Sequence, residues 1–223
     1  MMMIDKIIHL EEQHRPLIMK LQDCVLTNLP DKKLYSPFTV DDFERTLGSG
    51  GISIGVFDQE QLIAYACVLF PGLAEDNLGL DLGLPSEELS NVAHLEGAFV
   101  HPLYRGRSLQ KKMWFALEEI ITQKNTYRHL CATVSPYNYP SIKSTIGQGL
   151  VIRKLKIKYG NALRFIFHKD LLLPSKIDPD STLFIPVTEL KKTGKLLDSG
   201  HVGIEVIKNS KNEWSIALGK LIE

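Results

Sequence analysis

Short segments of alternating apolar and polar residues, or of continuous apolar residues, recur along the chain and predict β-strands. In residues 51–70 two such segments flank a polar turn, which is typical of a hairpin. A second hairpin is predicted where Gly160 and Asn161 form a two-residue turn between alternating segments. The expected strands cover residues 4–10, 52–56, 62–70, 95–100, 129–134, 154–159 and 163–167.

Other segments repeat apolar residues at intervals of three and four, which predicts amphipathic helices. The expected helices begin near residues 16, 39, 108 and 141. The second has the clearest limits, because Thr39 precedes Asp41 and Asp42 at its start and Gly48 stands at its end. Strands and helices therefore alternate along the chain, which indicates an α/β (α+β) fold.

The run Leu171-Leu172-Leu173-Pro174 is typical of a domain boundary. We expect one domain over residues 1–172 and a small β-rich extension over residues 173–223. The extension contains a predicted strand, a short helix and a hairpin, too little to bury an independent core. We therefore expect it to pack on the main domain or on a second subunit, so that a homodimer is one way to cover it.

Charge and cysteine content narrow the classes of function. The 26 basic and 26 acidic residues balance, which argues against nucleic acid or an anionic membrane as the main partner. Cys24, Cys67 and Cys131 lie far apart without a C-x-x-C pair, so we expect buried thiols and neither a metal site nor a disulfide framework. The first residues resemble neither a signal peptide nor a membrane span, and we expect a cytoplasmic protein.

Two charged segments each allow two interpretations. Residues 71–91 contain five acidic residues and no basic one. This segment is either a lid that guides a cationic amine or a solvated, partly disordered loop. Lys154, Lys156 and Lys158 alternate with apolar residues, which favours one solvated face of a sheet over a nucleic-acid surface because no aromatic residues interleave.

The stretch from His94 to Leu117 carries the most specific chemistry. An apolar strand broken only by Glu96 ends at Pro102, and a helix is expected to begin at Ser108, which we predict as its N-cap. A turn with two arginines before a helix leaves backbone N–H groups unpaired beside the positive end of the helix dipole. Such a turn is suited to bind an anion, most plausibly phosphate.

The residues Val100-His101-Pro102-Leu103-Tyr104-Arg105-Gly106 resemble the V-x-P-x-Y-R-G signature of the GNAT superfamily of acyl-CoA N-acyltransferases. The resemblance spans about residues 4–170 and implies a GNAT-like mixed, mostly antiparallel sheet flanked by helices. In this family the turn continues as R-x-x-G-x-G/A, and its backbone amides bind the pyrophosphate of coenzyme A. The small positions of that motif are Ser108 and Gln110 in this chain, where a side chain could obstruct the phosphate.

The resemblance also implies which residues bind acetyl-CoA. Family members hold pantetheine through the backbone of residues that correspond to Ala98 and Val100, and Asn138 belongs to a second family motif. That motif usually contains a tyrosine that protonates the departing thiolate, but Thr145 occupies its position, which leaves the acid unassigned. The implied cofactor-binding residues are Ala98, Val100, Arg105, Gly106, Arg107, Ser108, Gln110 and Asn138.

Glu96 is the candidate general base. An alkyl ammonium has a pKa near 10.4, so its proton must be removed before it can attack a thioester. Strand alternation places Glu96 on the face of Ala98, and family members often have a glutamate here; the alternative is an ordinary carboxylate paired with a lysine or arginine. The resemblance implies transfer of an acetyl group from acetyl-CoA directly to a small-molecule amine. The alternatives are a non-catalytic acyl-CoA-binding module and a protein N-acetyltransferase.

Overall fold

The computed structural model describes residues 6–29, 31, 35–210 and 212–222. The chain forms two compact units, one built from Met1–Pro71 and Ala93–Thr126 and the other from Gly72–Val92 and Tyr127–Glu223. We call them the first and the second unit. The predicted boundary between residues 172 and 173 lies within the second unit, and it stays a prediction.

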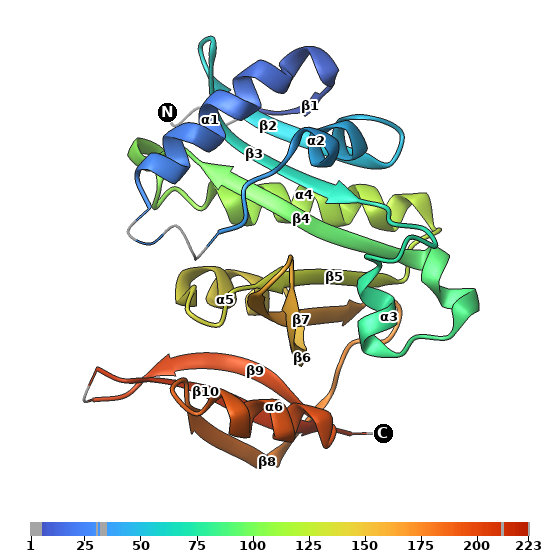
Figure 1. Cartoon of the computed structure of the whole chain (residues 1–223), viewed down its shortest axis with the longest axis vertical. Helices are drawn as coiled ribbons and strands as arrows, with labels where there is room; N and C mark the ends of the chain where they lie inside the picture. Colours follow the sequence, from blue (N-terminus) through green and yellow to red (C-terminus); the bar gives the residue numbers. More distant parts are fainter. Residues whose placement is uncertain (1–5, 30, 32–34, 211, 223) are drawn as a thin grey trace. The chain divides into compact units, whose positions relative to one another are not determined.

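The first unit holds four antiparallel strands in the order β1-β2-β3-β4, with helices on both faces (Figure 1). Its elements are β1 (Ile7–Leu10), η1 (Glu12–His14), α1 (Arg15–Thr27), α2 (Val40–Leu47), β2 (Gly51–Asp58), β3 (Gln61–Leu69), β4 (Val92–Val100), η4 (Pro102–Tyr104) and α4 (Leu109–Lys124). Helices α1 and α2 share one buried apolar cluster with β3 and β4, because Ile18 and Phe43 join Tyr65 and Phe99 there.

Local sequence signals explain the second helix. The Thr39 hydroxyl accepts a hydrogen bond from the backbone N–H of Asp42, and the Asp42 carboxylate accepts one from the backbone N–H of Thr39. This reciprocal capping box begins α2, and Gly48 ends it, as predicted. The first strand begins at Ile7, and the predicted residues 4 and 5 lie outside the described part of the chain.

The second unit holds six antiparallel strands in the order β5-β7-β6-β9-β10-β8. Its elements are α3 (Leu78–Leu82), η3 (Ser86–Asn91), β5 (His129–Val134), α5 (Tyr139–Ile146), β6 (Val151–Lys158), β7 (Ala162–Asp170), β8 (Ile177–Pro186), α6 (Leu190–Asp198), β9 (His201–Lys208) and β10 (Trp214–Leu221). The mostly antiparallel sheets with flanking helices confirm the predicted fold class.

Residues 173–223 join the sheet of the second unit through β9. Ile152 of β6 lies opposite Gly203 of β9, and a Cβ atom at position 203 would come within 2.8 Å of the Ile152 Cβ. Glycine therefore permits the close approach of these two strands. Residues 173–223 also contact helix α5, because the Tyr139 ring of α5 stacks on the Trp214 ring of β10 with 4.8 Å between centroids.

The acidic connection over residues 71–91 is structured, so the expectation of a solvated, partly disordered loop is wrong. It contains α3 and η3, and the buried Asn77 amide donates hydrogen bonds to the carbonyls of Gly72 and Leu89. Asp81 accepts hydrogen bonds from Lys156 at 2.9 Å and from Lys158 at 2.7 Å. The third alternating lysine of β6, Lys154, pairs with Asp198 at 3.0 Å, so carboxylates of the same unit engage all three.

Candidate active site

Glu96 is the extra residue of a β-bulge in β4. Gly97 lies opposite Cys67 of β3, but Leu95 lies opposite Val68, so the register shifts by one residue at Glu96. A bulge redirects the side chain of its extra residue, and bulges are common beside active sites. From Glu96 to Val100 half-buried and buried residues alternate along the strand, with Glu96, Ala98 and Val100 half-buried. This alternation agrees with the shared face that the sequence predicts.

The neighbourhood of Glu96 contains a buried imidazole. The Nδ1 atom of His94 lies 3.7 Å from a carboxylate oxygen of Glu96, and the exposed fractions of the two side chains are 3% and 22%. Within the described part of the chain, Glu96 forms no ion pair with a lysine or arginine. The carboxylate is therefore open to solvent on one side without a permanent cationic partner.

Aromatic residues between α1 and α2 pack beside Glu96. A Cβ atom at Gly97 would lie 2.6 Å from the tip of the Phe38 ring, so the ring occupies the space that a larger residue would need. The buried Gln22 side chain fixes this segment, accepting a hydrogen bond from the Phe38 N–H at 2.8 Å and donating one to the Phe38 carbonyl at 3.3 Å. The Tyr35 ring meets the Phe99 ring edge to face, with 5.4 Å between centroids.

Tyr35 is a phenol near Glu96 that the sequence did not single out. Burial raises the pKa of Tyr35 well above its usual value, and the nearby carboxylate of Glu96 adds to the rise. The Tyr35 hydroxyl therefore stays protonated at neutral pH. The signal that could have found it is the aromatic segment from Tyr35 to Phe38, placed between two helices.

The polar side chains of the second family motif, in and around helix α5, form contacts within the second unit. The Thr145 hydroxyl donates a hydrogen bond to the Ser141 carbonyl at 2.9 Å, and Tyr139 is stacked on Trp214. The Asn138 side chain caps α5, where its oxygen accepts a hydrogen bond from the Ser141 N–H at 3.2 Å. Asn138 belongs to the second unit, and the other predicted site residues belong to the first.

The turn before α4 has the backbone form of an anion site. Gly106 has φ of +81°, and Ser108 has φ of +57° and ψ of +23°, which is the left-handed conformation that glycine favours. Ser108 is the N-cap residue of α4, as predicted, but its hydroxyl makes no capping hydrogen bond. The N–H groups of the first turn of α4 therefore have no side-chain cap from Ser108.

The same turn is anchored to the hairpin of β2 and β3. The Tyr104 hydroxyl donates a 2.6 Å hydrogen bond to the carboxylate of Asp58, which raises the pKa of Tyr104. The Arg107 guanidinium lies 4.8 Å from the centre of the Tyr104 ring, a cation–π distance. Arg105 and Gly106 are exposed, and Gln110 is half-buried in the first turn of α4. The turn is thus held in place while its polar atoms face solvent.

The comparisons with known proteins agree with this fold. The family model described as the acetyltransferase (GNAT) family matches residues 18–144, more than half of the chain. No curated protein sequence matches the chain. Among solved structures, it is similar to Arabidopsis thaliana NAA60 in complex with acetyl-CoA, with 12% identity and a TM-score of 0.57 over 75% of this chain and 99% of that chain.

Two bacterial structures are similar to a comparable degree. The ribosomal-protein-S18-alanine N-acetyltransferase of Escherichia coli is 14% identical, with a TM-score of 0.52 over 74% of this chain and 92% of that chain. An N-acetyltransferase of Staphylococcus aureus Mu50 is 17% identical, with a TM-score of 0.53 over 74% of this chain and 98% of that chain. At such identities these structures show the fold alone.

The chain belongs to the GNAT family of acetyltransferases. It is therefore an acyl-CoA-dependent transferase of a family that uses acetyl-CoA. The three cysteines are free thiols; Cys67 and Cys131 are fully buried, as predicted, but Cys24 is only half-buried, so its predicted burial is wrong. Among the described residues, no helix is both long and apolar enough to cross a membrane.

Proposed function

We propose that this protein transfers an acetyl group from acetyl-CoA directly to the primary amine of a small molecule, with Glu96 as general base. The observation that carries this proposal is the partly exposed Glu96 carboxylate on a bulge of β4, without a paired lysine or arginine in the described part of the chain. A free carboxylate can accept the ammonium proton directly or through one water, which leaves a neutral amine to attack the thioester.

The cofactor part of the proposal rests on the turn before α4 and on β4. The left-handed Gly106 and Ser108 and the uncapped N–H groups at the start of α4 suit the pyrophosphate of coenzyme A. Arg105, Arg107 and Gln110 would supply further donors to the phosphate oxygens. Backbone groups of Ala98 and Val100 would hold the pantetheine arm in the manner that the family resemblance implies.

A protein N-terminus is the alternative acceptor. The structurally similar Escherichia coli enzyme is named as a ribosomal-protein-S18-alanine N-acetyltransferase, which describes that protein only. We favour a small amine because the aromatic segment from Tyr35 to Phe38 is fixed by Gln22 and packed close to Glu96. A rigid apolar wall beside the base would suit a compact acceptor better than an extended peptide.

Thiol release from acetyl-CoA on a panel of small amines and short peptides tests this function. We expect turnover with a small amine and a loss of at least about 100-fold in kcat for Glu96→Gln, because general base catalysis typically contributes about 10²–10⁴-fold. Glu60→Gln, which changes an exposed glutamate of the same unit, is the matched control and should retain activity. Unchanged turnover in Glu96→Gln would remove Glu96 from the mechanism.

Binding is measured separately from turnover. Acetyl-CoA should raise the melting temperature in proportion to its occupancy of the wild-type protein and of both variants. Binding without turnover on any amine or peptide would favour the non-catalytic module, and turnover on peptides alone would favour the protein acceptor. The absence of any melting shift at millimolar acetyl-CoA would contradict all of these functions.

A further inference from the structure

A buried chain of polar side chains crosses β5 and β7 in the second unit, among residues that the proposed acetyl transfer does not use. The Nε2 atom of His129 lies 2.7 Å from a carboxylate oxygen of Glu88, and its Nδ1 atom lies 3.0 Å from Nε2 of His168. The two imidazole rings are stacked with 5.2 Å between centroids, and both residues are buried. Glu88, His129 and His168 thus form one continuous hydrogen-bonded chain.

The order of donors along this chain determines what His168 can bind. An ionised carboxylate only accepts hydrogen bonds, so Nε2 of His129 must donate to Glu88. A neutral His129 then accepts at Nδ1, which requires Nε2 of His168 to donate. Burial lowers the pKa of His168 to about 4, to which repulsion by any proton on His129 and by the Arg153 guanidinium also contributes, so His168 is neutral at pH 7. Its Nδ1 atom is therefore left as an acceptor.

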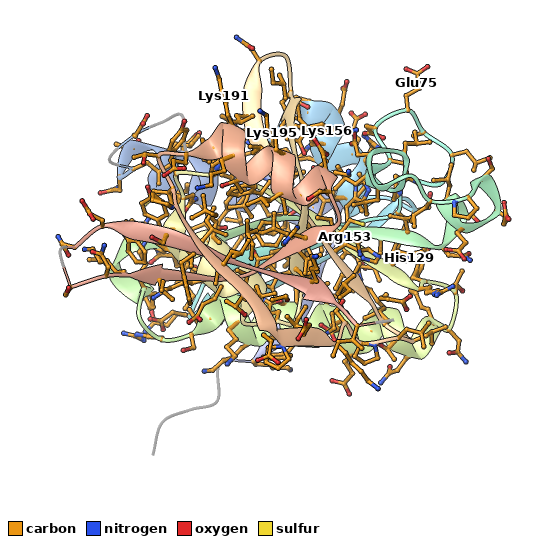
Figure 2. All side chains as sticks on the ribbon, turned by 90° about the horizontal axis from the view of Figure 1, so that it is seen from below. Glu75, His129, Arg153, Lys156, Lys191 and Lys195 are labelled. Carbon is orange, nitrogen blue, oxygen red and sulfur yellow. The ribbon has the colours of Figure 1, made fainter. Side chains whose placement is uncertain are left out.

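Arg153 supplies a positive charge near this acceptor. Ile152 lies opposite Phe167 and Lys154 opposite Ile166, so Arg153 is the extra residue of a bulge in β6, two residues after the partner of His168. Figure 2 shows Arg153 and His129 in the same part of the second unit. Arg153 is half-buried and burial lowers its pKa, yet within the described part of the chain it forms no hydrogen bond or ion pair.

The neighbouring cations already have partners. Arg128 pairs with Glu88 at 3.1 Å and with Asp170 at 2.8 Å. Lys154 pairs with Asp198 at 3.0 Å. Arg153 differs from these cations because its guanidinium is partly desolvated and has no carboxylate partner among the described residues. A guanidinium in this state is stabilised by an oxyanion that replaces its lost water.

We propose that Arg153 and His168 bind an oxyanion that still carries a proton at neutral pH, namely inorganic phosphate in its hydrogen phosphate and dihydrogen phosphate forms. The Arg153 guanidinium donates to the unprotonated oxygens, and the P–OH group donates to Nδ1 of His168. Sulfate has a similar size and shape but carries no proton at neutral pH, so it satisfies Arg153 and leaves His168 without a donor. The site would therefore prefer phosphate to sulfate.

Titration of the full chain with inorganic phosphate and with sodium sulfate, at pH 7 and equal ionic strength, tests this site by calorimetry and by the NMR signals of the histidines. We expect phosphate to bind at least about tenfold more tightly than sulfate and to shift the His168 signals. Glycerol phosphate, a simple monoester whose main form at pH 7 has no P–OH group, is the third titrant and should bind more weakly than inorganic phosphate; tighter binding of the ester would overturn the proposal.

Substitutions assign the binding to these residues. Arg153→Met should weaken phosphate binding more than about tenfold, and Lys154→Met, which removes the adjacent charge of the same strand, is the matched control and should not. His168→Phe should remove the preference for phosphate over sulfate. Three further results would each overturn the proposal. They are equal affinity of the wild type for the two ions, no binding of either ion at tens of millimolar, and normal phosphate binding by Arg153→Met. None of these outcomes depends on acetyl transfer.

Discussion

Replacing Gly97 by alanine would place a methyl group against the Phe38 ring, next to Glu96. The added Cβ atom would lie 2.6 Å from Cζ and 2.8 Å from Cε1 of Phe38. The ring has little room to withdraw, because Gln22 holds its backbone and the Phe43 and Phe99 rings pack on it with 5.4 and 5.6 Å between centroids. Either the ring or the strand must therefore shift.

The magnitude follows from two opposing terms. Overpacking of this kind costs about 1–3 kcal/mol. Replacing glycine by alanine also reduces the conformational freedom of the unfolded chain, which stabilises the folded state by about 0.4–1 kcal/mol. We expect a net loss of about 1–2 kcal/mol in the free energy of unfolding of Gly97→Ala, measured by urea denaturation. Gly194→Ala is the matched control, because its Cβ would meet only Leu155 Cδ2 at 3.7 Å in helix α6, and alanine should stabilise that helix.

A double-mutant cycle with Phe38→Leu tests the proposed cause. The smaller side chain removes the ring tip that the new methyl group would meet, so Gly97→Ala should cost less in the Phe38→Leu background. We expect a coupling free energy of about 1 kcal/mol or more between the two positions. Strictly additive effects, or a Gly97→Ala protein as stable as the wild type, would refute the close packing of Phe38 on β4.

Two further predictions concern backbone strain and pH. Ser108→Gly should leave stability unchanged or raise it by up to about 1 kcal/mol, since relief of left-handed strain outweighs the added chain entropy, and a fall in melting temperature would contradict this. The pKa of His168 is lowered on folding to about 4, so the folded state binds fewer protons and stability falls as pH drops from about 6.5 toward 4. Urea denaturation should show about 2 kcal/mol less stability at pH 5 than at pH 7.5, with a smaller difference in His168→Phe; an equal difference would exclude His168 as the cause.

Elements with strong local signals were predicted from the sequence, and elements held by distant contacts were not. The capping box of Thr39 and Asp42 needs only neighbouring residues, so α2 was found with both its ends. The short helices between β3 and β4 were missed, because Asp81 is held by lysines that are 75 and 77 residues away in the chain. No local pattern reveals such partners.

For the candidate site as well, the residues were predicted from the sequence, but their surroundings were not. Glu96 and the turn of Arg105 and Gly106 were recognised from residue types, spacing and the family resemblance. The bulge at Glu96 was not, because a bulge is defined by pairing with β3 and not by the strand itself. Ser108 was correctly predicted as the N-cap of α4, but its left-handed conformation and the lack of a capping hydrogen bond from its hydroxyl were not predicted, because residue identity does not reveal the backbone conformation of the turn.

By itself, the sequence determined the fold class, the family and the stretch where the chemistry lies, because periodicity and short motifs depend on residues close together in the chain. Only the tertiary structure decided the surroundings of Glu96, where Gly97 is small because Phe38 packs on it from another segment. It alone joined Glu88, His129 and His168 and left Arg153 without a carboxylate in the described part of the chain. Such environments depend on which distant strands become neighbours, and that choice follows from packing of the whole chain.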